Sequence, residues 1–267
     1  MGIVNVTPDS FADAAPLLDP ARAVDAALRM QDDGADLIDV GGESTRPGAE
    51  PVSVDEELRR VLPVVERLSS RLQIPISIDT SKARVAADAV AAGGAMVNDV
   101  RGLRDGPSLA EAIAPAGAAL VLMHSRGTPQ TMGEHAAYAD LMGEIARELQ
   151  EAILRARAGG VLLGRVIVDP GIGFAKRPEH SYGVLARFPA LAAALDRPIL
   201  VGPSRKSFLR EAVVDRPAAG RDWGTAAAVA AAVLAGAHIV RVHAVTEMVQ
   251  VVRVAEAIRK EGQRAEG

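Results

Sequence analysis

Short apolar runs rich in Val and Ile recur along the whole chain and predict strands. The runs are nearly continuous instead of alternating, which is typical of strands buried on both faces of a parallel sheet. Eight such runs are present, at residues 2–6, 36–40, 75–79, 95–99, 118–123, 165–169, 198–202 and 238–243.

Segments with helical patterns separate the apolar runs. Ser53, followed by acidic residues, is typical of a helix start, while Gly34 and Gly93 are typical of helix ends. We expect helices at residues 19–34, 53–72, 83–93, 108–116, 138–158, 178–195, 223–236 and 246–261. Eight strands that alternate with helices predict an α/β fold, a single (β/α)₈ TIM barrel that occupies residues 1–267 as one domain.

An open, doubly wound sheet is the alternative, because periodicity alone does not show whether a sheet closes. The pair Gly171 and Gly173 lacks the third glycine of a dinucleotide-binding fingerprint. The barrel is therefore the favoured fold.

Composition narrows the class of protein. Of 267 residues, 49% are hydrophobic and only 3% aromatic, so small and branched aliphatic residues must fill the core. This composition excludes a disordered chain, a collagen and a coiled coil. The chain has no cysteine, which excludes disulfides, thiolate nucleophiles and thiolate metal sites.

Charge and hydropathy limit the partners. A net charge of −4 argues against broad nucleic-acid binding. No apolar run reaches the ~18 residues of a membrane helix. We therefore expect a cytoplasmic protein that binds neither nucleic acid nor membrane. Lysine is rare in this arginine-rich chain, occurring only at Lys82, Lys176, Lys206 and Lys260.

The apolar runs end in polar residues, and in a barrel these ends form the active-site rim. The rim positions include Asn5, Asp9, Glu43, Thr45, Arg46, Asp79, Asn98, His124, Asp169, Ser204, Arg205, Lys206, Arg241 and His243. A carboxylate at a strand end can instead cap the next helix, and this alternative stays open for Asp79 and Asp169.

Several of these residues are basic and predict an anionic substrate. Arg46, Lys206 and Arg241 would face one cavity, which suits a phosphate or diphosphate. Arg241 and His243 lie two residues apart on one strand, so both side chains point the same way, into the barrel mouth. Alternatively, Arg241 pairs with a neighbouring carboxylate and His243 is a core residue.

Asp79, Asn98 and Asp169 predict recognition of a flat heterocycle. A carboxylate can accept two hydrogen bonds from an amidine-like edge, and an asparagine supplies both a donor and an acceptor, which suits a guanine or pterin ring. No spacing resembles a dedicated zinc or iron site. A Mg²⁺ ion bound by substrate phosphates and Asn5 is the simpler expectation.

Seven motifs in order resemble those of the dihydropteroate synthases, which are pterin-binding TIM barrels. The motifs are Asn5 to Phe11, Gly41 to Gly48, Ser77 to Thr80, Asn98 to Val100, Asp169 to Lys176, Ser204 to Phe208 and Val240 to His243. The resemblance implies a transferase of folate biosynthesis that is a homodimer. It would condense 6-hydroxymethyl-7,8-dihydropterin diphosphate with 4-aminobenzoate, releasing 7,8-dihydropteroate and diphosphate with the help of Mg²⁺.

The resemblance also implies roles for residues at matching positions. The pterin pocket would contain Asp79, Asn98, Val100, Met123, Asp169, Phe174, Gly202, Lys206 and Arg241. Diphosphate would contact Asn5, Arg46, Arg241 and His243, with the metal on Asn5, and 4-aminobenzoate would contact Phe11, Thr45, Pro47, Lys206 and Ser207. The catalytic residues would be Asp9, Asp13, Arg46, Asp79 and Lys206.

The chain departs from the family pattern in its first loop. Ala14 and Ala15 replace two glycines, which predicts a smaller closing movement of that loop. Two further functions therefore stay open. One is a catalytically silent pterin-binding paralogue, and the other is a barrel like the methyltetrahydrofolate:corrinoid methyltransferases, which need no diphosphate site.

Overall fold

A computed structural model describes residues 1–7, 19–46, 48–214 and 216–265. Each apolar run contains one short parallel strand, as predicted. The strands are β1 (Gly2–Asn5), β2 (Ile38–Gly41), β3 (Ile76–Asp79), β4 (Met96–Asp99), β5 (Ala119–Met123), β6 (Val166–Asp169), β7 (Leu200–Val201) and β8 (Ile239–Val240).

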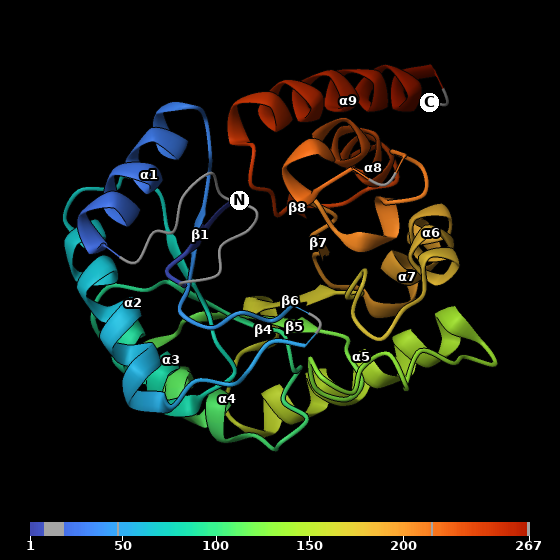
Figure 1. Ribbon diagram of the computed structural model, residues 1–267. Helices are drawn as coiled ribbons and strands as arrows, with labels where there is room; N and C mark the ends of the chain where they lie inside the picture. The colour runs from blue at the N-terminus through green and yellow to red at the C-terminus, as the bar shows by residue number, and fades with distance from the viewer. Residues whose placement is uncertain (8–18, 47, 215, 266–267) are drawn as a thin grey trace.

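Hydrogen bonds between the strands close the sheet into a barrel (Figure 1). β1 to β6 pair in chain order, and β7 pairs with β8. Isolated parallel bridges, Val168 with Ile199 and Gly2 with Val242, join these two sheets at both seams. At the second seam the Ile3 N–H donates to the Val242 carbonyl over 3.1 Å. The closed ring confirms the TIM barrel, and the open doubly wound alternative is wrong.

The helices surround the barrel. They are α1 (Pro20–Asp32), α2 (Val54–Ser69), α3 (Ala83–Ala91), α4 (Ser108–Ile113), α5 (Leu141–Ala158), α6 (Pro178–Ala186), α7 (Phe188–Leu195), α8 (Asp222–Leu234) and α9 (Val245–Ala265). None of the described helices is long and apolar enough to cross a membrane.

Local chemistry explains where the helix bounds differ from the prediction. The segment expected as one helix over 178–195 divides at Arg187, because Pro189 has no N–H and its ring is incompatible with a continuing helix. α5 begins at Leu141 and not at 138, since Asp140 caps it by accepting a hydrogen bond from the Gly143 N–H.

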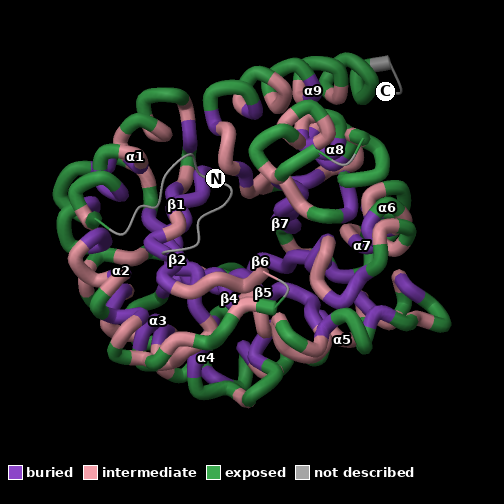
Figure 2. Tube along the Cα trace, viewed as in Figure 1, coloured by how far each residue is buried: buried purple, intermediate pink, exposed green. Residues whose placement is uncertain are grey.

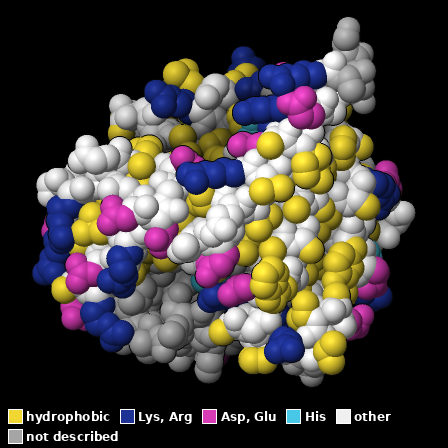
Figure 3. Space-filling model, turned by 90° about the horizontal axis from the view of Figure 1, so that it is seen from above, with side chains coloured by type: hydrophobic (Ala, Val, Ile, Leu, Met, Phe, Trp, Pro, Cys, Tyr) yellow, Lys and Arg dark blue, Asp and Glu magenta, His cyan; other side chains and the backbone are white. Residues whose placement is uncertain are grey.

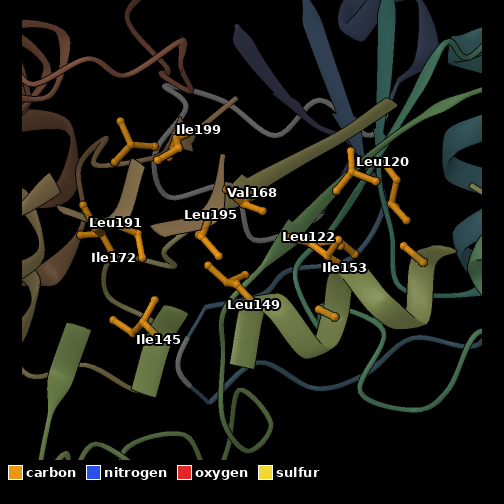
Figure 4. Close-up of a cluster of buried hydrophobic side chains, with 14 of the residues drawn as sticks. Leu120, Leu122, Ile145, Leu149, Ile153, Val168, Ile172, Leu191, Leu195 and Ile199 are labelled. Carbon is orange, nitrogen blue, oxygen red and sulfur yellow. The ribbon is translucent and has the colours of Figure 1, made fainter. Parts of the chain in front are cut away.

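Apolar side chains fill two regions around the strands. Between the strands and the helices, Leu120 and Leu122 of β5 pack with Leu149 and Ile153 of α5 (Figure 4). Inside the barrel, a smaller cluster forms an apolar floor, composed of Met1, Met96, Val121, Ile167 and Leu200. Burial is deepest along the strands, and the outer faces of the helices are exposed (Figure 2). Polar side chains occupy the barrel above this floor.

Candidate active site

A cavity of about 430 Å³ opens at the carboxyl ends of the strands. Of the eighteen predicted site residues, fourteen line it: Asn5, Thr45, Arg46, Asp79, Asn98, Val100, Met123, Asp169, Phe174, Gly202, Lys206, Ser207, Arg241 and His243. The other four, Asp9, Phe11, Asp13 and Pro47, lie outside the described residues. The structure thus brings together residues from all eight strand ends, and the individual roles stay predictions.

Polar side chains on strands form one part of the site, which we call the acidic wall; its members are Asp39, Asp79, Asn98 and Asp169. Arg241 connects two of them, since its Nε donates to Asp39 Oδ2 and one terminal nitrogen donates to Asp79 Oδ2, both over 2.6 Å. The alternative of a salt-bridged Arg241 is therefore correct, yet the same side chain lines the cavity.

Asp79 does not cap the following helix. The residue at the cap position of α3 is Lys82, which makes no side-chain capping bond. Burial raises the pKa of Asp79 to about 7; Arg241 opposes the shift, while Asp39, Glu57 and Asp99 add to it. The Asp79 carboxyl is thus only partly ionised at neutral pH.

Asp169 is buried at the end of β6, where its Oδ1 accepts a hydrogen bond from the Gly171 N–H over 2.7 Å. Burial raises its pKa, and the nearby Lys206 ammonium opposes the shift. At a given pH, Asp79 and Asp169 are therefore both less ionised than an aspartate exposed to water.

The cavity also has cations on the loops that follow the strands, and we call Arg46 and Lys206 with Ser207 the cationic wall. Lys206 Nζ donates to the Ile172 carbonyl over 2.6 Å and lies 4.6 Å from the centre of the Phe174 ring. Gly173 has a φ of +79°, a backbone conformation that favours glycine, and a Cβ there would also come within 3.1 Å of the Lys206 side chain. Burial lowers the pKa of Lys206 to about 8, against the opposing charge of Asp169.

His243 also lines the cavity, and it is uncharged there. Burial lowers its pKa to about 3, and the nearby Arg241 and other basic groups add to the shift. The Ser204 hydroxyl accepts from the His243 backbone N–H and lies 2.9 Å from Nδ1, so its own hydrogen can be donated to that nitrogen. The neutral ring then carries its hydrogen on Nε2, available to a ligand.

Buried charges anchor the loop that follows β2. Lys82 Nζ lies 2.5 Å from a carboxylate oxygen of Glu43 in this loop and 2.5 Å from one of Glu57 on α2. Glu57 is completely buried. The Val52 N–H also donates to Glu43, over 3.1 Å. Lys82 therefore ties the segment that contains Thr45 and Arg46 to the body of the barrel.

A second lysine anchors the loop that follows β6. Lys176 Nζ lies 2.7 Å from His124 Nδ1 and donates to the Phe174 carbonyl over 3.2 Å. On its far side, His124 Nε2 lies 3.1 Å from Glu148 of α5. Burial lowers the pKa of Lys176 to about 7 and that of His124 to about 4. This chain of contacts fixes the backbone that carries Phe174.

Two charged residues at the site were not singled out from the sequence. Asp39 lies inside β2 and not at a strand end, although an acid within an apolar run was a usable signal. Arg221 also lines the cavity, but it precedes α8 and is far from any strand end in the sequence, so no sequence signal marked it.

Comparisons with known proteins agree with this geometry. The profile of the family described as pterin binding enzyme matches residues 1–243. The dihydropteroate synthase of Synechocystis is 46% identical over 259 residues, covering 97% of this chain and 89% of the relative. The chain belongs to the dihydropteroate synthase family.

Solved structures of that family have the same fold. The Yersinia pestis dihydropteroate synthase, solved with a sulfonamide drug, is 43% identical with a TM-score of 0.93, covering 97% of this chain and 94% of that one. The Xanthomonas albilineans dihydropteroate synthase with 4-aminobenzoic acid is 42% identical with a TM-score of 0.88, covering 97% and 92%. These similarities favour a synthase over a corrinoid methyltransferase.

Proposed function

We propose that this member of the dihydropteroate synthase family condenses 6-hydroxymethyl-7,8-dihydropterin diphosphate with 4-aminobenzoate. The observation that carries the proposal is the cavity in which Asp79, Asn98 and Asp169 face Lys206 and Arg241. The carboxyls can accept the N–H groups of a pterin edge, while the cations suit the diphosphate. The aminobenzoic acid bound by the Xanthomonas relative supports the second substrate.

The reaction needs no covalent intermediate with the protein. The amine nitrogen attacks the pterin methylene carbon, the bond from that carbon to the diphosphate oxygen breaks, and the nitrogen loses one proton. Positive charge develops on the pterin and negative charge on the leaving group. The acidic wall stabilises the first and the cationic wall the second, which is electrostatic catalysis by groups already in place.

The described residues would supply only part of the ligands of a Mg²⁺ ion, and the substrate would supply the others. They contain no group of three His, Cys, Asp or Glu side chains that could hold a metal. Asn5 lines the cavity and offers one amide oxygen, so diphosphate oxygens would supply further ligands. Bound there, Mg²⁺ would neutralise charge on the leaving group. Removal of metal with EDTA should stop turnover, and Asn5→Ala should raise the Mg²⁺ concentration required.

The decisive test is diphosphate release by the purified protein with Mg²⁺. We expect release only when the dihydropterin diphosphate and 4-aminobenzoate are both present. A folded protein that releases no diphosphate contradicts the proposal. If calorimetry then shows pterin binding without product, the chain is the silent paralogue instead.

We also propose that the enzyme is a homodimer through α8 and α9. Leu234 of α8 is exposed, and on α9 Val254 and Ile258 are 61% and 57% exposed. Seen from above, hydrophobic side chains gather on one half of this face of the molecule (Figure 3). Sedimentation should show a dimer that V254D and I258D together dissociate, while a monomeric wild-type protein would refute this arrangement.

A further inference from the structure

Asp39 is a fully buried carboxylate in the barrel interior that the known chemistry does not require. It lies in the middle of β2, opposite Ser77 of β3 in the strand register. A buried carboxylate is costly unless it is paired and hydrogen-bonded. All its hydrogen bonds go to one atom, because Oδ2 accepts from Arg241 Nε at 2.6 Å and from Asn98 Nδ2 at 3.3 Å. Oδ1 is buried without a partner.

This contact determines the orientation of the Asn98 amide. An ionised carboxylate only accepts hydrogen bonds, so the amide nitrogen of Asn98 must face Asp39. The Asn98 carbonyl oxygen is left buried and without a partner, in a residue that lines the cavity. The amide nitrogen has two hydrogens and Asp39 accepts one of them, so Asn98 keeps a donor as well as its acceptor oxygen, and the expectation that it offers a ligand both stays a prediction.

The same carboxylate fixes the Arg241 guanidinium. Asp39 on β2 and Asp79 on β3 bind two different nitrogens of this group, each over 2.6 Å. Two contacts to a planar group fix its plane as well as its position. Arg241 is thereby held beside Asp79, and the remaining Asp79 oxygen stays available to a ligand.

We propose that Asp39 is a positioning residue of the pterin pocket, which fixes the orientation of the Asn98 amide and holds the Arg241 guanidinium beside Asp79. This inference rests on the proposed function. Asp39 itself contacts no substrate, since its side chain is covered by Arg241 and Asn98.

The charge of Asp39 adds a second, measurable effect. The charged groups that act on Asp79 are Arg241, which follows β8, Lys206, which follows β7, Asp39 of β2, Glu57 of α2 and Asp99 of β4. Arg241 lowers the pKa of Asp79, whereas the three carboxylates raise it. Removing the Asp39 charge should therefore lower the pKa of Asp79 and move the acid limb of the pH profile to lower pH.

The test compares D39A, D39N and the matched control S77A. Ser77 lies beside Asp39 in the same layer, is equally buried, and has a hydroxyl without a partner. The measurements are the affinity for 6-hydroxymethyl-7,8-dihydropterin diphosphate, the KM values of both substrates, and the pH dependence of kcat/KM.

We expect D39A to weaken pterin affinity by roughly 10- to 100-fold, because two charge-assisted hydrogen bonds are lost. The KM for 4-aminobenzoate should change by less than about 3-fold, since the amine site is on the other wall. D39N can place its oxygen where Oδ2 lies, so it should restore most of the affinity while its acid limb moves to lower pH. S77A should behave as wild type.

Unchanged pterin affinity in D39A refutes the inference. An equal weakening of the binding of both substrates also refutes it. If D39A does not fold, an unshifted acid limb in D39N refutes it. A wild-type protein that binds no pterin would instead refute the proposed function, so the two failures are distinguishable.

Discussion

The acidic and cationic walls of the cavity are built from different parts of the fold. Asp39, Asp79 and Asn98 lie on strands, are almost fully buried, and are connected through Arg241. Arg46 and Lys206 lie on loops beyond the strands, which lysines and glutamates tie back to the barrel. Strands give a rigid surface, which suits the recognition of a flat ring. Loops can move, which allows the diphosphate substrate to enter and the released diphosphate to leave.

Three of the four lysines lie at the site or hold its loops. Lys82 and Lys176 anchor the loops after β2 and β6, and Lys206 lines the cavity. Lys260 is exposed on α9.

The largest effect should come from the acidic wall. D79N keeps the shape of Asp79 but replaces one acceptor with a donor, so kcat/KM for the pterin substrate should fall by at least about 100-fold. The unfolding free energy should change by no more than about 2 kcal/mol. Diphosphate release and urea denaturation measure the two quantities. Collapse of folding with no separate catalytic loss would show that the acidic wall is structural.

The loop anchor should have a large effect on stability. K82M leaves the buried Glu57 without its cation and should lower the unfolding free energy by roughly 3 kcal/mol. K260M, at an exposed position, is the control and should change it by less than about 0.5 kcal/mol. Urea denaturation would separate the two variants, and equal stabilities would show that the Lys82 anchor contributes nothing.

The pH dependence of kcat/KM should distinguish the two walls, because activity is lost when Asp79 gains a proton and when Lys206 loses one. Burial raises the pKa of Asp79 to about 7 and lowers that of Lys206 to about 8. Because the reaction uses the ionised form of each, kcat/KM should fall below pH 7 as Asp79 gains a proton and above pH 8 as Lys206 loses one. In K206R the alkaline limb should disappear, and a limb that stays in place would assign it to another group.

The smallest effect should come from the contact between Phe174 and Lys206. F174L removes the ring beneath the ammonium, 4.6 Å away, but keeps an apolar side chain. Such a contact is worth about 0.5–1 kcal/mol, so kcat/KM should fall by roughly 2- to 5-fold. Initial rates with each substrate varied in turn would measure it. A loss as large as that of D79N would place Phe174 among the essential groups.

Much of the site was predictable because strand ends are marked in the sequence. Asp79 and Asp169 each close an apolar run and Asn98 lies one residue before the end of another, and closure of the barrel brings such ends together. Asp39 was missed since its partners, Asn98 and Arg241, are 59 and 202 residues away in the chain. The neighbouring residues in the sequence do not show that a carboxylate within a strand is paired inside a barrel.

The sequence by itself determined the strands, most of the helices and the rim residues, since these depend on local patterns of apolar and polar side chains. Only the tertiary structure decided that the ring closes, that His243 is neutral, and that the Asn98 amide nitrogen donates to Asp39. These properties depend on burial and on partners distant in the chain. Electrostatic energies depend on such surroundings more strongly than on residue type.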